Sequence, residues 1–469
     1  MSMRYQVGCA AILAFAATGT ARAEGPTGSE TSVSSVSAAD RSRRCGLGAA
    51  FHAGRRSVLR AKLEKGLVLV RGLPPTRGYT SFRQDKTFWY LTGVESPDAA
   101  LLLDAESGAE ILFLPEKSAH GERWEGELWD TGDAWVREVT GFRDLRPIGD
   151  LLGVLKKKLA SEQVVWISTE PHVELSGCYD RAQPHDARVA KDPLDGRTSR
   201  EKALAARLGE DLGATVRDMT PILDEMRRVK TPEEVDAIRR ASQAGAAAMA
   251  EAMRSTRPGV GEWQIDALMT FVHRQEGADG PAYHAIVGSG PNSLALHTSA
   301  CSRVMNAGEV LLVDYAPELD HYTSDITRSW PVDGKLTPRM EEIYDAVLAA
   351  QEAGIAAVRP GRTMGDIDRA CKAVLRERGL VELMPHGSCH YVGMEVHDVG
   401  RKDAPFEPGV VFTVEPGVYE PATGIGVRIE DVVVVTEDGC EVLSSGVPKD
   451  KRGVLELCAA EGLLDRESE

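Results

Sequence analysis

The sequence predicts an α+β protein in two parts, in which a smaller α/β region precedes a larger region built twice from one unit of helices and strands. Three observations support this fold class. The chain has 469 residues, which at roughly 100–200 residues per domain suggests two or three domains. Short apolar runs alternate with polar helical stretches in the first part. In the second part, a series of residues recurs after about 102 positions.

The composition excludes two classes of protein. Charged residues make up 27% of the chain and hydrophobic residues 42%, which is typical of globular proteins. The formal net charge of −16 argues against a nucleic-acid partner, because phosphate backbones attract Lys and Arg. After the first 25 positions the sequence has no stretch of 18 or more apolar residues, which excludes a polytopic membrane protein.

The first 23 residues have the features of an export signal. Arg4 is basic, the apolar run over 7–17 is too short to span a bilayer, and Ala21-Arg22-Ala23 supplies the small residues before a cleavage point. We therefore predict a signal peptide over 1–23 and an exported protein, periplasmic or extracellular, with no membrane span after cleavage. Residues 24–43 are rich in Ser, Thr, Gly and Ala and are expected to form a disordered tether.

Eight cysteines occur, and seven remain after signal removal. None belongs to a CxxC pair, so a thiolate zinc site is not expected. Export permits disulfides, but a chain with two large domains does not need them, and we predict none.

The smaller α/β domain is predicted over 44–222. Apolar runs predict strands at 66–70 and 164–168, and a hairpin formed by 99–104 and 111–114. This domain has few ionisable residues at spacings that suggest chemistry.

The larger domain is predicted over 223–447 and is followed by a carboxy-terminal tail over 448–469. Thr231, Pro232 and Glu234 form a capping box with proline at the first helical position, so a helix begins there. It is expected to end near Thr256, ahead of Pro258-Gly259.

An internal duplication runs through this domain. Each half is expected to contain two helices and then a hairpin with one acid on each strand. The matching pairs are Arg257-Pro258-Gly259 with Arg359-Pro360-Gly361, Ile265-Asp266 with Ile367-Asp368, Gly277 with Gly379, Asp314 with Glu415, and Asp325 with Glu430.

The four duplicated acids predict a metal centre. Asp314 and Glu415 follow apolar runs, so their strands are expected to be buried. Two copies of one unit usually pack about a pseudo-twofold axis, which brings equivalent positions together. Because burying four carboxylates is very costly unless cations neutralise them, two metal ions are the natural explanation.

Histidines cluster in the same part of the sequence. Five of the eleven lie in two matching segments, one ahead of each pair of acids, which favours roles as metal ligands and in proton transfer. They are His284, His297, His386, His390 and His397.

The order Asp, Asp, His, Glu, Glu resembles that of the metal ligands in the pita-bread metallopeptidases, which include methionine aminopeptidase, Xaa-Pro aminopeptidase and prolidase. The matching residues are Asp314, Asp325, His390, Glu415 and Glu430, and the supporting strings are Ser324-Asp-Ile-Thr-Arg328, His397-Asp-Val-Gly400, Val414-Glu-Pro-Gly417 and Arg428-Ile-Glu430. Arg83-Gln84 with 88–93 looks like the smaller domain of the proline-specific branch. The resemblance implies a duplicated pita-bread domain after a creatinase/aminopeptidase-P-like α/β domain.

The resemblance also implies how the ligands divide between two ions. Asp325 and Glu430 would bridge the ions, Asp314 would complete one ligand shell, and His390 with Glu415 would complete the other. Four carboxylates suit an oxygen-preferring ion, so Mn²⁺ is expected first, with Zn²⁺ or Co²⁺ possible. A shared water that loses a proton between the ions would attack the scissile carbonyl.

Further roles follow from the same resemblance. Glu415 would also relay protons, and His297 and His397 would hold the carbonyl and the developing tetrahedral centre. His386 would line the substrate pocket. Arg428 would orient acidic groups or substrate, and its position two residues before Glu430 on a strand would place both on one face.

The resulting prediction is a secreted dimetal aminopeptidase that removes the residue before a penultimate proline, expected as a homo-oligomer (dimer or tetramer). An Xaa-Pro dipeptidase is the alternative. Prolidases carry a longer segment with an arginine where six residues here separate Gly400 from Glu407, and Arg401 is the only arginine in it, which favours the aminopeptidase. A metal-free creatinase-like enzyme or a binding protein is disfavoured because all five ligands are present.

Two departures from the family pattern are expected to affect specificity. Asp314-Tyr315-Ala316 stands where the family commonly has Asp-Ala-Gly, and Thr298-Ser-Ala-Cys301 follows His297 where Tyr and Asn are frequent. We expect both changes to lie near the substrate.

Overall fold

The computed structural model describes residues 44–173, 176–299 and 301–468. The predicted signal peptide over 1–23 and the tether over 24–43 lie outside the described residues. Both therefore stay predictions.

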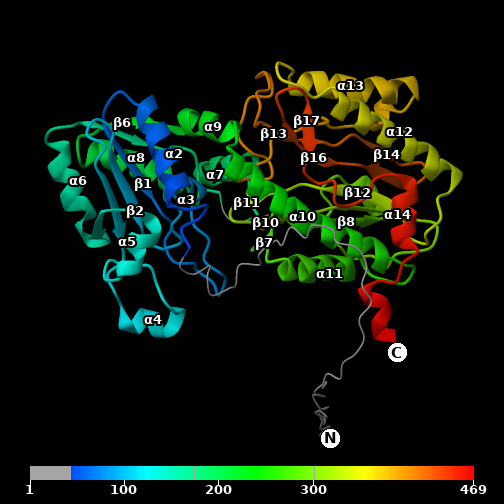
Figure 1. Ribbon diagram of the computed structural model, residues 1–469, viewed down its shortest axis with the longest axis horizontal. Helices are drawn as coiled ribbons and strands as arrows, with labels where there is room; N and C mark the ends of the chain where they lie inside the picture. The colour runs from blue at the N-terminus through cyan, green and yellow to red at the C-terminus, as the bar shows by residue number, and fades with distance from the viewer. Residues whose placement is uncertain (1–43, 174–175, 300, 469) are drawn as a thin grey trace, which may run out of the picture. The chain divides into compact units, whose positions relative to one another are not determined.

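A six-stranded mixed sheet organises the first region, in the order β4-β3-β2-β1-β5-β6 (Figure 1). β2 pairs antiparallel with β1 and β3, and the other neighbours are parallel. The predicted strands and hairpin are confirmed, with ends that differ by one residue. The strands are β1 (Leu67–Arg71), β2 (Ala100–Asp104), β3 (Glu110–Leu114), β4 (Asp144–Pro147), β5 (Val164–Ile167) and β6 (Thr215–Asp218).

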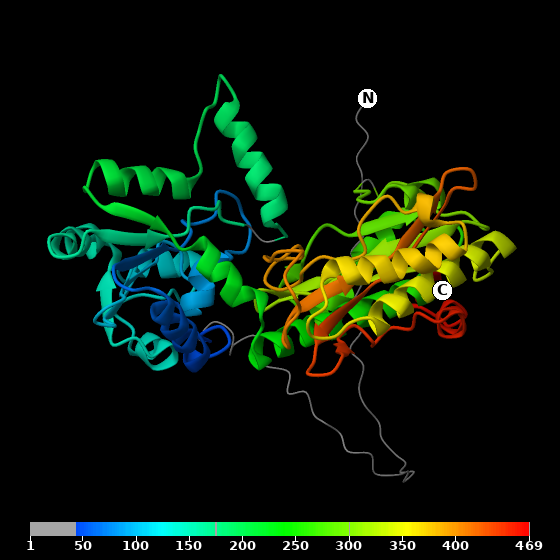
Figure 2. The same cartoon turned by 90° about the horizontal axis from the view of Figure 1, so that it is seen from above.

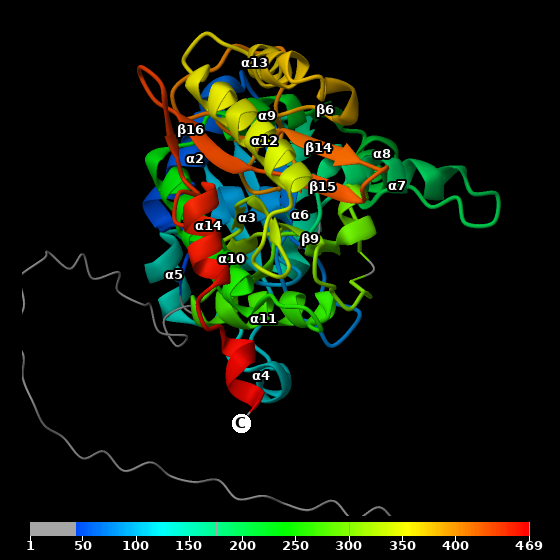
Figure 3. The same ribbon diagram turned by 90° about the vertical axis from the view of Figure 1, so that its right-hand side faces the viewer.

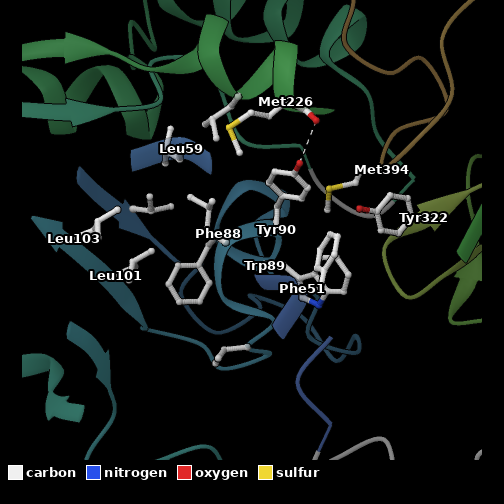
Figure 4. Close-up of a cluster of buried hydrophobic side chains, with 14 of the residues drawn as sticks. Phe51, Leu59, Phe88, Trp89, Tyr90, Leu101, Leu103, Met226, Tyr322 and Met394 are labelled. Carbon is white, nitrogen blue, oxygen red and sulfur yellow. Dashed lines mark hydrogen bonds between the residues drawn. The ribbon is translucent and has the colours of Figure 1, made fainter. Parts of the chain in front are cut away.

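Helices cover both faces of this sheet because its strands are apolar on both sides. Leu101 and Leu103 pack with Leu59 and Phe88 on one face (Figure 4), and Leu102 packs with residues of α6 and α8 on the other. The helices of this region, of which α4 and α7 have no buried residue, are α2 (Ala49–Lys62), α3 (Lys86–Thr92), α4 (Ala119–Glu125), α5 (Ala134–Thr140), α6 (Leu151–Leu159), α7 (Tyr179–Lys191) and α8 (Arg200–Glu210).

The connection to the second region is α9 (Thr220–Arg228), followed by α10 (Pro232–Ser255). The capping box of α10 is confirmed, since Thr231 Oγ1 accepts from the Glu234 amide and Glu234 Oε2 accepts from the Thr231 amide at 2.9 Å. The helix ends at Ser255, as predicted.

The duplication is visible as two copies of a helix pair and a strand pair (Figures 2 and 3). Leu311 and Val313 of β9 pack against α10 and α11, and Phe412 and Val414 of β13 pack against α12 and α13. β9 pairs antiparallel with β12, and β13 pairs antiparallel with β16. The elements are α11 (Glu262–Gln275), β8 (Ile286–Ser289), β9 (Val310–Asp314), β12 (Thr327–Pro331), α12 (Pro338–Ala356), α13 (Met364–Glu377), β13 (Val411–Val414), β16 (Asp431–Val435) and β17 (Cys440–Val442).

Neither strand pair is the simple hairpin that the sequence suggested. A short inner pair of strands is inserted in each half, so the two outer strands pair without a tight turn between them. The inner strands are β10 (Pro317–Leu319) and β11 (Tyr322–Thr323) in the first half, where β10 also pairs with β7 (Gly280–Pro281), and β14 (Gly417–Glu420) and β15 (Ile425–Arg428) in the second.

The carboxy-terminal segment contains a further helix, α14 (Lys451–Cys458). Val454 of α14 is buried with Ala246 and Met249 of α10, so part of the predicted tail belongs to the core. Among the described residues, no helix is long and apolar enough to cross a membrane. Seven described cysteines have free thiols, and Cys301 is one of them.

Candidate active site

The four duplicated acids lie at strand ends, where the two halves meet. Asp314 is the last residue of β9 and Glu415 follows β13, while Asp325 and Glu430 stand just before β12 and β16. The prediction that each acid lies on a strand is therefore wrong for three of them, because the inner strands lead the chain out and back before the second outer strand begins.

His390 joins the acids from the loop ahead of β13. Its Nε2 lies 3.3 Å from Asp325 Oδ2 and 3.5 Å from Glu415 Oε1. Asp325, His390 and Glu430 each offer a ligand atom within 4.8 Å of the others. The structure thus brings together the residues that the sequence nominated as ligands.

Arg428 fixes the first acid. Its Nη2 donates to Asp314 Oδ2 at 2.5 Å, its Nε to Thr327 Oγ1 at 3.0 Å and its Nη1 to the Tyr419 hydroxyl at 2.7 Å. β15 ends at Arg428, and Glu430 lies in the link to β16, so the expectation that both lie on one strand is wrong, although both side chains line the same cavity. The arginine orients an acidic group, which was one of its two predicted roles.

The electrostatics of the cluster fit a cation site. Burial and the charge of Asp314 together raise the pKa of Asp325 to about 6. The pKa of Glu430 is raised well above its ordinary value by burial and by Asp325 and Glu415. Within the described residues, Glu430 Oε1 is buried without a hydrogen-bond partner. Burying several carboxylates together costs free energy unless a cation neutralises them, and carboxylate oxygens are the ligands that a hard divalent ion prefers.

His390 has the opposite shift. Burial alone would lower its pKa, but contact with Asp325 and the charge of Glu415 raise it to about 9. A metal ion at His390 would have to displace that proton.

Tyr283 is a site residue that the sequence analysis missed. Its hydroxyl lies 2.6 Å from Oδ1 of Asp314 and 2.6 Å from Oδ1 of Asp325. Burial and these two charges raise the pKa of Tyr283 well above its ordinary value. The available signal was its position directly before His284, the first histidine of the cluster.

The predicted histidines line one cavity of about 1000 Å³ together with the acids. His386 Nε2 lies 3.0 Å from the Tyr419 hydroxyl, and the ring of His397 lies 4.2 Å from that of His390. The structure therefore places His297, His386 and His397 around the same cavity as Glu415.

Two residues from the first region also reach this cavity, and no motif in the sequence marks them. Asp180 Oδ2 lies 2.5 Å from His397 Nδ1, and Arg181 Nη2 lies 3.1 Å from His297 Nδ1. The hydrogen bond from His397 holds the pKa of Asp180 below its usual range. Contacts of this kind depend on how the two regions pack, which spacing along the chain cannot show.

A buried ion network holds the loop that carries His397. Arg227 Nη2 donates to Glu395 Oε1 at 2.9 Å and to Asp398 Oδ1 at 2.5 Å, and Lys230 Nζ donates to Asp398 Oδ2 at 2.9 Å. The connection between the two regions thereby fixes the residue next to His397.

One of the two departures does not lie near the cavity. Tyr315 is fully buried with Met249 and Met253, and its hydroxyl contacts His273 Nδ1. Side chains alternate along an extended segment, so Tyr315 points away from the face that carries Asp314. The expectation for Tyr315 is therefore wrong, whereas Ser299 of the second departure does line the cavity.

Arg401 is a surface residue. Its side chain is 80% exposed and pairs with Asp403 at 2.8 Å. Of the six residues between Gly400 and Glu407, Lys402 lines the cavity.

Comparison with known proteins defines the class. The model for metallopeptidase family M24 matches residues 236–437, and the model for the aminopeptidase P N-terminal domain matches residues 52–166. The chain is 31% identical over 412 residues to Xaa-Pro aminopeptidase 3 of Rattus norvegicus, covering 81% of this chain and 77% of the relative. Over 412 residues it is also 31% identical to the Xaa-Pro aminopeptidase of Escherichia coli strain K12, covering 81% and 89%.

Solved structures agree with this assignment. Aminopeptidase PepP of Pseudomonas aeruginosa superposes with a TM-score of 0.73 at 30% identity, over 90% of this chain and 99% of that one. The Escherichia coli aminopeptidase P crystallised with the inhibitor Pro-Leu gives 0.72 at 30% identity, over 87% and 98%.

The fold and the site define a metallo-aminopeptidase with the pita-bread fold. The chain belongs to metallopeptidase family M24, in the group that carries an aminopeptidase P N-terminal domain. Membership of this family implies divalent metal ions, and the acid cluster fits them.

Proposed function

We propose that this enzyme hydrolyses the peptide bond between an amino-terminal residue and a penultimate proline. The observation that carries the proposal is the meeting of the five candidate ligands and three histidines at one cavity, in a chain with an aminopeptidase P N-terminal domain. Relatives with the same two-part organisation are named Xaa-Pro aminopeptidases. A peptide with proline at position 2 is accordingly the proposed substrate.

Two divalent ions would be held by Asp314, Asp325, His390, Glu415 and Glu430. Four of these five ligands are carboxylates, so Mn²⁺ is the first candidate, and Zn²⁺ or Co²⁺ are the alternatives. When bound, such ions lower the pKa of a coordinated water and polarise a carbonyl.

The chain's own groups would then bind and orient the peptide and move protons. Glu415, at the cavity and beside His390, is placed to accept and return a proton. The Thr327 hydroxyl holds Glu430 in place, since it donates to Glu430 Oε2 at 2.5 Å. Arg428 holds Asp314 in the same way through its Nη2. His297 and His397 line the cavity in which the scissile carbonyl would bind, and His386 lies beside them.

A dipeptidase remains the second candidate because exposed cations, Arg181 and Lys402, line the cavity. Arg401 points to solvent, but the guanidinium of Arg181 lines the cavity and could pair with the carboxylate of an Xaa-Pro dipeptide. A non-peptidase role is disfavoured, because all five candidate ligands converge. The proposal includes export and homo-oligomer formation. It includes no nucleic-acid partner.

The test is an assay of the metal-loaded enzyme on Xaa-Pro dipeptides and Xaa-Pro-Yaa tripeptides. We expect kcat/KM to be at least about tenfold higher for the tripeptides, about 1.4 kcal/mol in transition-state binding. Equal or faster cleavage of dipeptides, with a KM that rises in Arg181→Met, would establish the dipeptidase instead. Cleavage of neither would reject the proposed function.

A further inference from the structure

Two consecutive residues at the start of α7 each contact one cavity histidine at the same ring atom. Asp180 Oδ2 lies 2.5 Å from His397 Nδ1, and Arg181 Nη2 lies 3.1 Å from His297 Nδ1. Both histidines come from the other region of the chain and line the cavity. One helix start therefore contacts both rings.

The two partners impose opposite requirements on those nitrogens. A guanidinium has only N–H groups, so His297 Nδ1 must accept, and the hydrogen of the neutral ring is then on Nε2. A carboxylate only accepts, so His397 Nδ1 must carry a hydrogen, and Nε2 of the neutral ring then has a free lone pair.

Asp180 is itself held in place from its other oxygen. The Cys178 thiol donates to Asp180 Oδ1 at 2.6 Å, and the Tyr179 amide donates to Glu395 Oε2 at 2.9 Å. Glu395 also accepts from Arg227, which binds Asp398 next to His397. The start of α7 and the loop of His397 are thus fixed to the same arginine.

We propose that Asp180 and Arg181 are positioning residues that set opposite tautomers of His397 and His297. His297 presents Nε2–H as a hydrogen-bond donor, and neutral His397 presents Nε2 as an acceptor. Resting on the proposed function, these tautomers assign the carbonyl oxygen of the peptide to Nε2–H of His297, because the Nε2 lone pair of neutral His397 cannot donate a hydrogen bond to an oxygen. His397 instead accepts a hydrogen from the substrate or from water.

The tautomers can be observed directly. The protein is labelled with ¹⁵N-histidine and loaded with Zn²⁺, because Mn²⁺ would broaden the signals, and long-range ¹H–¹⁵N correlations identify the protonated nitrogen of each ring. His297→Gln and His397→Gln assign the signals. We expect Nε2–H for His297 and Nδ1–H for His397. The same tautomer in both rings would overturn the proposal.

Variants at the helix start give the second readout. Asp180→Asn introduces an amide that can donate, so His397 should shift toward Nε2–H. Arg181→Met should leave His297 as a mixture, while Arg181→Lys, which also only donates, should preserve Nε2–H. Asp186→Asn and Arg188→Met on the outer part of the same helix are the matched controls. Unchanged tautomers in Asp180→Asn and Arg181→Met would refute the assignment.

Kinetics separate a positioning role from a purely structural one. We expect kcat for a Xaa-Pro-Yaa tripeptide to fall at least about tenfold in Asp180→Asn, with KM changed less than about threefold, and both controls to match the parent enzyme. Unchanged kcat despite a shifted tautomer would overturn the functional part. The NMR measurement requires no turnover. If the expected tautomers were observed in an enzyme that cleaves no Xaa-Pro peptide, the proposed function would be rejected and the tautomer assignment would stand.

Discussion

The hydroxyl of Tyr283 lies 2.6 Å from one oxygen of Asp314 and 2.6 Å from one oxygen of Asp325. A hydroxyl has a single hydrogen, so it donates to one of these carboxylates at a time. Tyr283 thereby links an acid at the end of β9 to an acid just ahead of β12.

Removing this hydroxyl should weaken the site without unfolding it. A hydrogen bond to a charged group contributes about 1.5–3 kcal/mol, so Tyr283→Phe should lower kcat/KM roughly 10- to 100-fold. Tyr315→Phe is the control, because that hydroxyl contacts His273 inside the core and should leave kcat within about twofold. Equal losses in both variants would contradict a specific role for Tyr283.

Glu430 is proposed to contact both metal ions, so Glu430→Gln should weaken metal binding and remove most of the activity. Metal content per chain after dialysis, measured by plasma mass spectrometry, checks the first effect, and peptide hydrolysis checks the second. Glu441→Gln, at the exposed residue of β17, is the control. Two ions per chain and near-normal turnover in Glu430→Gln would show that the ligand assignment is wrong.

Metal affinity should increase with pH. In the metal-free protein the pKa of Asp325 is raised to about 6 and that of His390 to about 9, so both groups hold protons that a metal must displace. Glu430, whose pKa is also raised, adds to the number of displaced protons, so we expect metal binding to release more protons per chain near pH 5 than near pH 7.5. Calorimetric titration in buffers of different ionisation enthalpy measures this number, and pH-independent affinity between pH 5 and 8 would exclude the mechanism.

Arg227→Met should destabilise the fold strongly. The side chain is 3% exposed and pairs with two buried carboxylates, and breaking a buried ion pair costs about 3–5 kcal/mol. Arg239→Met, which breaks the exposed pair with Glu441, should cost at most about 1 kcal/mol. Urea unfolding of the two variants gives both free energies, and similar values would argue against the network as a support of the His397 loop.

Export is checked by expression of the full sequence in a bacterium. The mature protein should begin near Glu24 and should be found outside the cytoplasm. Amino-terminal sequencing and cell fractionation give the answer, and an intact Met1 in the cytoplasm would disprove export.

The sequence predicted the acid cluster because two independent features pointed to it. Asp314 and Glu415 follow apolar runs, and the duplication implied that equivalent acids meet. Burying several negative charges together is very costly unless cations neutralise them, so the acids predicted a metal centre. The same reasoning predicted the helix pairs and the main strands, since each has its own caps or apolar pattern.

Other parts of the site could not be predicted because they depend on tertiary contacts. Asp180 stands 217 positions before His397, and nothing in its local pattern marks it. Tyr283 was overlooked because a phenol is a common core residue. Tyr315 was placed near the substrate from its neighbour Asp314, although adjacent residues of an extended segment face opposite sides.

The long separation between Asp180 and His397 has a consequence during synthesis. At roughly 5–20 residues per second, a ribosome that has just added Asp180 needs roughly 10–40 s more to reach its histidine partner. During this interval the strands of the first sheet are completed, but Asp180 still lacks the histidine that it contacts in the folded protein. A chain cut short before residue 397 would carry that sheet without a working peptidase, so hydrolysis is confined to molecules whose translation is nearly finished.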